Sequence, residues 1–406
     1  MNHESRRSGG LVSWLPVLTL TLCAFIFNTS EFIPIGLLTD IGRDFGTSEA
    51  QTGWLVTVYA WVVATLSLPL MLAAAKTELK RLMLILLGLF FISNVLSGLS
   101  ANYWMLMASR IGVACAHSIF WSIVGPLAVE VAPARRRSAA LSMVVVGSSI
   151  AMIVGLPMGR MLGLALGWRM TFLTIGAFAA LAFFCLAKLF PRVPSNNAVA
   201  LSDVPKLLTR PSLLGIYILT PVMMTGNFTM YSYIEPYLAQ VAGMAEGTIT
   251  LTLAAYGLVG LLASWLFSHF YDRAPFAFMR ASVVGIAVTI LLMGPASASE
   301  PAIIALVVVW GLFVTFYGLV FQSAVITAAP TGTAVAMSVY SGIFNVGIGS
   351  GALVGGLVCT HLSIADIGYV GGGIAAAAAL FCLAFVVPVF KKLKDEQRRV
   401  KETPDD

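Results

Sequence analysis

The chain is a succession of apolar runs, each long enough to cross a lipid bilayer and each bounded by Pro, Gly or charged residues. Only helices and closed barrels satisfy their backbone hydrogen bonds in lipid, and these runs are longer and more uniformly apolar than barrel strands. A helix needs about 20 apolar residues to span. We therefore predict an all-α membrane protein with about twelve transmembrane helices. The runs fall at 13–39, 48–74, 81–100, 103–130, 138–163, 168–190, 213–239, 246–270, 278–296, 301–327, 332–360 and 366–390.

The composition excludes a set of soluble domains. The chain is 59% hydrophobic and 10% charged, whereas soluble domains are about 25% charged. The pI near 9.1 does not indicate nucleic acid, because Lys and Arg lie in short loops between apolar runs, where they set topology. The five cysteines are scattered singly and offer no metal site or disulfide framework. We find no nucleotide-binding loop or nucleophile motif, so we expect no cofactor, no metal and no enzyme activity.

The distribution of basic residues predicts the orientation. With a cytoplasmic N-terminus, only Arg43, Arg160 and Arg169 fall outside, and Arg110 lies within a helix. This asymmetry predicts that both termini are cytoplasmic. The first apolar run continues to spanning length, so it is a membrane helix and not a signal peptide. The basic residues placed inside are Arg6, Arg7, Lys76, Lys80, Arg81, Arg135, Arg136, Arg137, Lys188, Arg192, Lys206, Arg210, Arg273, Arg280 and those from Lys391 to Lys401.

A proline-rich and basic segment at 191–211 divides the chain into two halves. We predict a six-helix bundle at 1–190, a cytoplasmic linker at 191–211, a second six-helix bundle at 212–390 and a cytoplasmic tail at 391–406. A shift of 196 residues aligns the fifth run with the eleventh, since it places Ser142 on Ser338, Gly155 on Gly351 and Gly159 on Gly355. The two bundles are therefore predicted to be pseudo-symmetric, and parallel repeats place substrate sites near mid-membrane.

Glu31 is an acidic residue inside the first apolar run. A carboxylate there costs about 2.5–3.5 kcal/mol on insertion scales, which makes it a functional candidate. Arg110 lies in the fourth run, which crosses in the opposite direction, and both residues are about 10–12 Å deep. Desolvation favours the neutral acid, whereas a nearby guanidinium favours the carboxylate. We predict that Glu31 and Arg110 form a switchable pair that couples to protons. The alternative is a permanent ion pair that joins two helices.

Several polar and aromatic residues within the runs are predicted to bind substrate. Amides, hydroxyls and aromatic faces together suit a neutral polar solute such as a sugar. The alternatives are that the histidine packs through a hydrogen bond, that aromatic residues anchor helix ends at the interface, and that Glu235 is solvated. The candidates are Asn28, His117, Trp121, Asn227, Tyr231, Glu235 and Gln322.

The fifth run carries small residues at four-residue spacing. Gly147, Gly155 and Gly159 share a helix face, and Pro157 lies between the last two. Such spacing lets helix backbones approach closely. The eleventh run is also glycine-rich, and we expect the two runs to mark a contact across which the halves rock. Generic helix packing is the alternative.

These residues resemble the major facilitator superfamily, in particular its drug and sugar/proton antiporters. Gly155 to Gly159 resembles the antiporter motif of that group, and Ser109 to Val113 resembles its Arg-centred motif, which is associated with proton coupling. The resemblance to bacterial sugar efflux transporters spans nearly the whole chain. Its segments are Ala24 to Leu38, Tyr59 to Val63, Ala116 to Trp121, Gly167 to Phe172, Tyr231 to Pro236 and Ser341 to Asn345.

The resemblance implies twelve helices and export of sugars by proton exchange across a bacterial inner membrane. We also expect the protein to be a monomer. Arabinose and alkyl thiogalactosides are the implied substrates, and a multidrug/proton antiporter that exports amphiphilic compounds is the alternative. Ala73 to Arg81 departs from the family pattern Gly-x-x-x-Asp-Arg-x-Gly-Arg-Arg/Lys, because it lacks the Asp and the glycines. An Asp-Arg pair occurs only in the second half, at Asp272 and Arg273.

Overall fold

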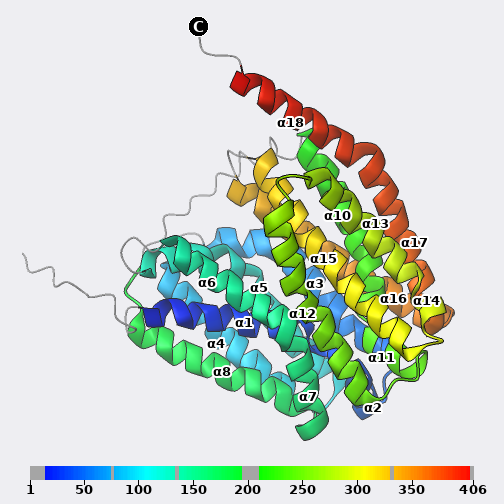
Figure 1. Ribbon diagram of the computed structural model, residues 1–406. Helices are drawn as coiled ribbons and strands as arrows, with labels where there is room; N and C mark the ends of the chain where they lie inside the picture. The colour runs from blue at the N-terminus through cyan, green and yellow to red at the C-terminus, as the bar shows by residue number, and fades with distance from the viewer. Residues whose placement is uncertain (1–13, 75–76, 133–136, 194–209, 330–332, 403–406) are drawn as a thin grey trace, which may run out of the picture. The chain divides into compact units, whose positions relative to one another are not determined.

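The computed structural model describes residues 14–74, 77–132, 137–193, 210–329 and 333–402 (Figure 1). Throughout these ranges the regular secondary structure is helical. Most of the predicted linker at 191–211 lies outside the described residues, as do the last residues of the tail. The same holds for Arg6, Arg7, Lys76, Arg135, Arg136 and Lys206.

Each predicted apolar run contains helix. The first half comprises α1 (Leu15–Gly36), α2 (Leu38–Phe45), α3 (Glu49–Ala74), α4 (Leu79–Gly98), α5 (Tyr103–Val131), α6 (Arg137–Ile150), η2 (Ala151–Gly155), α7 (Leu156–Leu166) and α8 (Trp168–Leu189). The second comprises α10 (Pro211–Tyr231), α11 (Ile234–Gln240), α12 (Glu246–Phe270), α13 (Pro275–Leu291), α14 (Met293–Ala296), α15 (Glu300–Ala328), α16 (Thr333–His361), η4 (Ile364–Asp366), α17 (Ile367–Phe381), η5 (Cys382–Val386) and α18 (Val387–Glu402).

Eight helical segments within the described ranges are long and apolar enough to cross a membrane, and Pro275–Leu291 is a shorter apolar helix. Some runs are divided where the sequence analysis expected one helix. The fifth run becomes α6, the π-helical turn η2 and then α7, with Pro157 in the first turn of α7. Proline has no N–H and its ring clashes with the carbonyl four residues earlier, so regular α-helical bonding is interrupted there.

The chain divides into two compact units. The first comprises Met1–Gly46 and Thr65–Ala198, and the second comprises Thr47–Ala64 and Val199–Asp406. The division between the halves lies within the predicted linker. The first part of α3, however, clusters with the second unit, whereas the sequence analysis placed all of 1–190 in one bundle.

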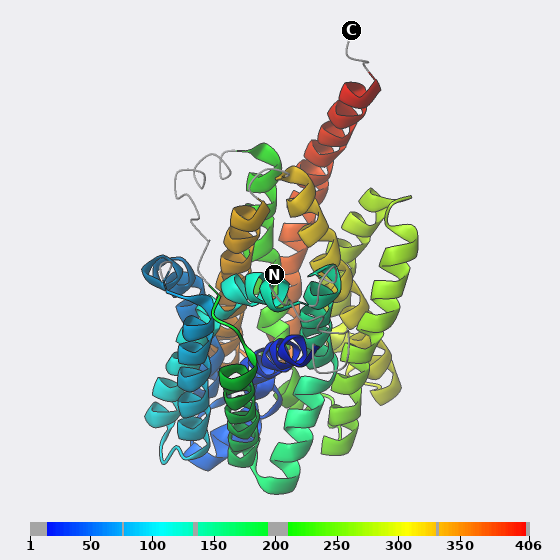
Figure 2. The same ribbon diagram turned by 90° about the vertical axis from the view of Figure 1, so that its left-hand side faces the viewer.

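Each unit is built around its own first long helix. In the first unit α1 contacts α5, α6, α7 and α8, and its residues from Ala24 to Gly36 are mostly buried. In the second unit α10 contacts α13, α15, α16 and α17. Helix α18 continues from α17 and extends beyond the other helices of its unit (Figures 1 and 2). Side chains on α1 and α10 are therefore shielded by helices of their own unit.

Glycines of η2 and α16 make equivalent contacts in the two units. A Cβ atom on Gly155 would lie 2.5 Å from Thr29 Oγ1, and one on Gly351 would lie 2.7 Å from the Thr225 carbonyl oxygen. The shift of 196 residues relates the two glycines to each other, and it also relates the two threonines that they face. The internal repeat is therefore present in a helix–helix contact as well as in the sequence.

A second glycine pair follows the same relation. A Cβ atom on Gly159 would lie 2.7 Å from Ile33, and one on Gly355 would lie 2.8 Å from the carbonyl oxygen of Thr229. At these positions each glycine packs against the first helix of its own unit. The expectation that the two glycine-rich runs mark a contact across which the halves rock stays a prediction.

Candidate functional site

Glu31 lies near the C-terminal end of α1, where a proline interrupts the regular helical hydrogen bonding. Pro34 is inside α1 and has no N–H to give to the carbonyl four residues earlier, that of Ser30. The helix ends at Gly36, and α2 begins after Leu37. Glu31 is 8% exposed and the residues around it on α1 are also buried. The acid is thus buried inside the protein.

Arg110 on α5 is directed at this segment of α1. It is buried, and its Nη1 donates to Ser30 Oγ at 3.2 Å while its Nη2 donates to the main-chain carbonyl of Glu31 at 3.4 Å. Ser30 in turn donates to Asn94 Oδ1 on α4 at 3.1 Å. The predicted proximity of Glu31 and Arg110 is therefore present, and the guanidinium is fixed through a hydroxyl and a main-chain carbonyl. Arg110 places a positive charge beside the acid.

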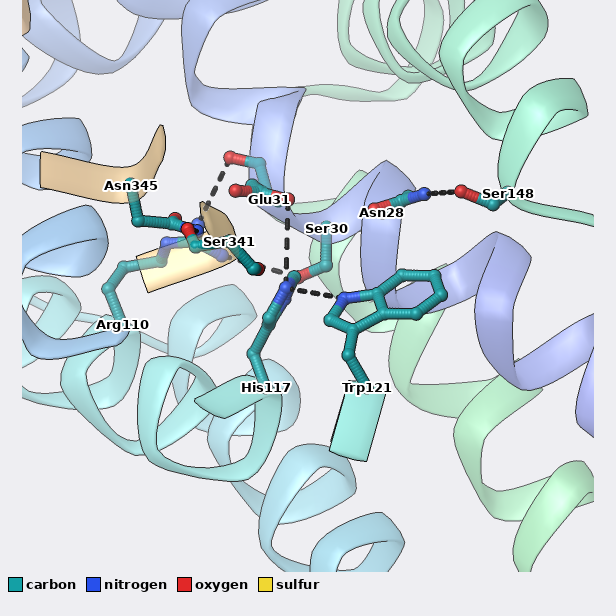
Figure 3. A network of polar contacts seen from close by, with 9 residues as sticks. All are labelled: Asn28, Ser30, Glu31, Arg110, His117, Trp121, Ser148, Ser341 and Asn345. Atoms are coloured by element: carbon teal, nitrogen blue, oxygen red, sulfur yellow. Dashed lines mark hydrogen bonds and ion pairs between the residues drawn. The ribbon is translucent and has the colours of Figure 1, made fainter. Parts of the chain in front are cut away.

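His117 faces the carboxyl group of Glu31. Its Nε2 lies 3.8 Å from Glu31 Oε2, and the same Nε2 accepts a hydrogen bond of 2.8 Å from Trp121 Nε1 (Figure 3). His117 and Trp121 are four residues apart on α5, so they lie on one face. An indole N–H can only donate. Nε2 therefore carries a lone pair, and the imidazole is neutral with its proton on Nδ1.

The side chains of Glu31, His117 and Trp121 differ in solvent accessibility. Glu31 and His117 are buried, whereas Trp121 is partly exposed. On the other side of His117 the Phe27 ring approaches edge-on, with centroids 6.0 Å apart, and Phe27 stacks on Phe120 at 4.1 Å. Trp121 is therefore the most accessible of these three side chains.

Asn28 extends the polar surface of α1 towards α6. Its Nδ2 donates to Ser148 Oγ (Figure 3). Asn28 is buried and Ser148 is partly exposed. Five of the predicted site residues therefore gather within the first unit, from α1 and α5. These are Asn28, Glu31, Arg110, His117 and Trp121.

A second polar and aromatic cluster lies in the other unit. Asn227 on α10 accepts a hydrogen bond of 3.0 Å from Trp310 Nε1 on α15. Tyr231 stacks on Tyr256 of α12, with centroids 5.3 Å apart, and meets Trp310 edge-on at 5.9 Å. Three aromatic rings from α10, α12 and α15 thus pack together, and one of them, Trp310, donates to a buried amide. Sequence analysis identified Asn227 and Tyr231 but missed Tyr256 and Trp310, which it read as parts of apolar runs.

The other two predicted substrate residues are placed differently. Gln322 is exposed and lies twelve positions after Trp310 on α15, about 18 Å along the helix. It is therefore separate from the Asn227 cluster. Glu235, considered as a solvated residue near the interface, is 3% exposed on α11. Glu235 is thus a buried acid in the second unit, in addition to Glu31 in the first.

Arg160, which the sequence analysis counted among the few basic residues on the outer side, is a buried helix residue. It lies in α7, is 2% exposed, and donates through Nη1 to the Gly36 carbonyl at 2.7 Å. That carbonyl belongs to the last turn of α1, where helices leave carbonyls without intrahelical donors and where positive charge is favourable. The sequence did hold a signal for this contact. Pro34 and Gly36 end α1, and the end of a helix leaves carbonyl groups that a buried arginine can bind.

The described residues include no group of three or more His, Cys, Asp or Glu that is arranged to hold a metal ion. The cysteines Cys23, Cys115, Cys185, Cys359 and Cys382 are unpaired and either buried or partly buried. The chemistry at Glu31 is therefore that of carboxyl, imidazole, indole and guanidinium groups.

Comparisons with known proteins identify a family and a fold. The sequence model of the Major Facilitator Superfamily matches residues 20–335 of this chain. A crystal structure of a bacterial homologue of the human lysosomal transporter Spinster, inward-facing and unoccupied, is similar at 16% identity with a TM-score of 0.64, over 95% of both chains.

Two other solved structures share the architecture. A POT family transporter in complex with 5-aminolevulinic acid has 12% identity and a TM-score of 0.76, over 92% of this chain and 96% of that one. A variant of the nucleoside transporter NupG has 12% identity and a TM-score of 0.71, over 91% and 99%. At these identities the likeness establishes the fold alone.

Proposed function

The chain belongs to the Major Facilitator Superfamily, and from that premise we propose that it exports small sugars in exchange for protons. The family makes it a multi-pass membrane transporter and not an enzyme. In the proposed cycle the two halves give alternating access to a central site. Glu31 takes up a proton from outside and releases it inside, while the sugar leaves outward. Arabinose and alkyl thiogalactosides are the substrate class implied by the sequence resemblance.

One observation carries this proposal. A buried carboxyl group, Glu31, lies 3.8 Å from the buried imidazole of His117 and beside the guanidinium of Arg110. A buried acid that exchanges its proton needs a partner for each charge state. Arg110 suits the carboxylate, and the buried surroundings suit the neutral acid. Asn28 and Trp121 supply polar atoms next to that group, as a sugar site requires.

The other residues complete the proposed site and architecture. Asn227 and Tyr231 would bind the sugar from the second unit, and Glu235 and Gln322 remain candidates there. Twelve spanning helices in two six-helix bundles, with a linker at 191–211, are supported by the two units and by the glycine contacts repeated after 196 residues. We place the protein in a bacterial inner membrane as a monomer with both termini cytoplasmic, with no cofactor, metal or nucleic acid as partner.

The test is flux into proteoliposomes under an imposed pH gradient. Glu31→Gln keeps the size of the side chain but removes its titratable proton. We expect it to abolish gradient-driven sugar transport and to leave substrate-dependent exchange intact. Glu246→Gln is the matched control, because it makes the same change at an exposed position at the start of α12. Gradient-driven transport at the normal rate in Glu31→Gln would overturn the proposal.

The cluster of Tyr231, Tyr256 and Trp310 favours a second candidate, export of amphiphilic drugs by the same proton exchange. Aromatic faces bind apolar rings and cations without hydrogen-bond specificity. Binding measurements separate the two candidates. A drug site should tolerate Asn28→Ala and His117→Gln while its aromatic residues remain, whereas a sugar site should lose its ligand. A thermal-shift screen of the purified protein against sugars and cationic drugs is the first step.

A further inference from the structure

The hydrogen bond between Trp121 and His117 occupies the atom that a proton from Glu31 would need. Trp121 Nε1 and Glu31 Oε2 both face the single lone pair of His117 Nε2, at 2.8 Å and 3.8 Å. The shorter distance is a hydrogen bond, and the longer one is beyond hydrogen-bond range. A nitrogen lone pair that accepts the indole N–H cannot also bind a proton. The two events therefore exclude each other.

From this geometry we propose that Trp121 is a coupling residue that prevents His117 from taking a proton until a solute arrives. The inference rests on the proposed function and adds the link between solute and proton. A hydroxyl oxygen of the solute accepts the indole N–H, and Nε2 then becomes available to Glu31. Trp121 is the partly exposed member of the three, so it is the side chain of the three that a solute can most readily contact.

The proton step balances within the side chains present. The O–H bond of protonated Glu31 breaks, and its electron pair stays on the carboxylate. The Nε2 lone pair of His117 forms the new N–H bond, which gives an imidazolium. The charged neighbours that the structure describes are Glu31 on α1, which attracts the imidazolium, and Arg110 on α5, which repels it. The imidazolium state is therefore transient, as a step in a cycle requires.

The packing of His117 supports a fixed orientation. Phe27 approaches one side of the imidazole edge-on, and Phe120, stacked on Phe27, meets the Trp121 ring edge-on with centroids 5.0 Å apart. These rings limit the rotation of both side chains. Loss of the indole N–H would therefore change the protonation of Nε2 without a new side-chain position.

The experiment is nitrogen NMR of the full-length protein in lipid nanodiscs, labelled with ¹⁵N-histidine. The chain has four histidines, and His117→Gln assigns the signal of interest. In the wild type without solute, Nε2 should be the unprotonated nitrogen. In Trp121→Phe, which keeps an aromatic ring but has no N–H, the fraction protonated at Nε2 should rise at least tenfold at the same pH. Trp104→Phe is the matched control, on the same helix at a largely exposed position.

Isopropyl thiogalactoside, added to the wild type, should move the His117 signal towards that of Trp121→Phe and should leave the variant's signal unchanged. A proton on Nε2 in the wild type without solute, or the same signal in wild type and Trp121→Phe, would overturn the inference. Transport of this sugar with no change at His117 would overturn it too. Sugar flux is measured in parallel. Its absence would count against the proposed function, while the comparison of the two proteins would still decide the role of Trp121.

Discussion

Arg110 acts at the scale of single hydrogen bonds. Its guanidinium reaches two acceptors on α1, the Ser30 hydroxyl and the Glu31 carbonyl, at 3.2 and 3.4 Å. The planar fork of arginine can do this, whereas the ammonium of lysine is a single point charge. The position of α1 around the acid therefore depends on the shape of the side chain at 110 as well as on its charge.

We accordingly expect Arg110→Lys to reduce gradient-driven sugar flux about tenfold, the effect of about 1.4 kcal/mol on the barrier. The charge is kept, so solute exchange should fall less than gradient-driven transport. Flux in proteoliposomes measures both. Arg43→Lys, at an exposed position on α2, is the control. Wild-type flux in Arg110→Lys would show that the two-point contact is not needed.

Arg160 gives a second prediction at this scale. Because it is buried and donates to the Gly36 carbonyl at 2.7 Å, Arg160→Met should keep most of the volume but lose a charge-assisted hydrogen bond. Such bonds contribute about 1.5–3 kcal/mol. We expect a lower thermal unfolding temperature in detergent, with Arg43→Met unchanged. An unaltered unfolding temperature would mean that the end of α1 is held by other contacts.

At the scale of helices, the glycine face of α6 and α7 sets how closely they approach α1. A Cβ atom on Gly147 would meet the main-chain carbonyl of Thr21, whereas one on Gly163 would meet the end of the Leu37 side chain. A main-chain carbonyl in a helix cannot move without moving the helix. The end of a leucine side chain can change rotamer. The two sites therefore differ although both are glycines on one face.

The resulting prediction compares two identical substitutions. Gly147→Ala should destabilise the protein by about 1–3 kcal/mol, as overpacking does. Gly163→Ala should be close to neutral, because the gain of about 0.5–1 kcal/mol from replacing glycine within a helix offsets the local repacking. Thermal unfolding of both variants in the same detergent measures the difference. Equal effects at the two positions would contradict the assignment of Thr21 as the rigid neighbour.

At the scale of the whole molecule, α3 belongs to two units. Its first part, within Thr47–Ala64, clusters with the second unit, and the remainder belongs to the first. Within the second unit, Glu49 accepts a hydrogen bond of 2.9 Å from Gln240 at the end of α11, and Trp61 lies against Gly349 of α16. If the two halves move relative to each other during transport, the first part of α3 must move with the rest of its helix. It would then separate from Gln240 and Gly349.

A cross-link tests this movement. In a variant with its five cysteines replaced by alanine, Glu49→Cys with Gln240→Cys, joined by a short bis-thiosulfonate, should stop sugar flux, and a reductant should restore it. The control joins Asp44→Cys to Arg169→Cys, an exposed ion pair within the first unit, and should leave flux unchanged. Normal flux with Glu49 and Gln240 positions joined would show that α3 stays with the second unit throughout the cycle.

The sequence by itself determined that this chain is a helical membrane protein with a buried acid and a buried arginine at similar depths. Hydropathy and run length are local properties, and the bilayer imposes them on every spanning segment. The depths of Glu31 and Arg110 follow from counting residues along a helix of fixed rise. The repeat after 196 residues was also readable, because equivalent glycines mark equivalent close contacts.

Only the tertiary structure decided which side chains meet. It placed His117 opposite Glu31, with Trp121 as the hydrogen-bond donor to His117 Nε2. It also buried Arg160 at the end of α1 and separated Gln322 from Asn227. It also assigned the first part of α3 to the second unit. The reason is physical: the rotation of each helix about its axis is set by packing against its neighbours, and periodicity within one apolar run leaves that rotation undetermined.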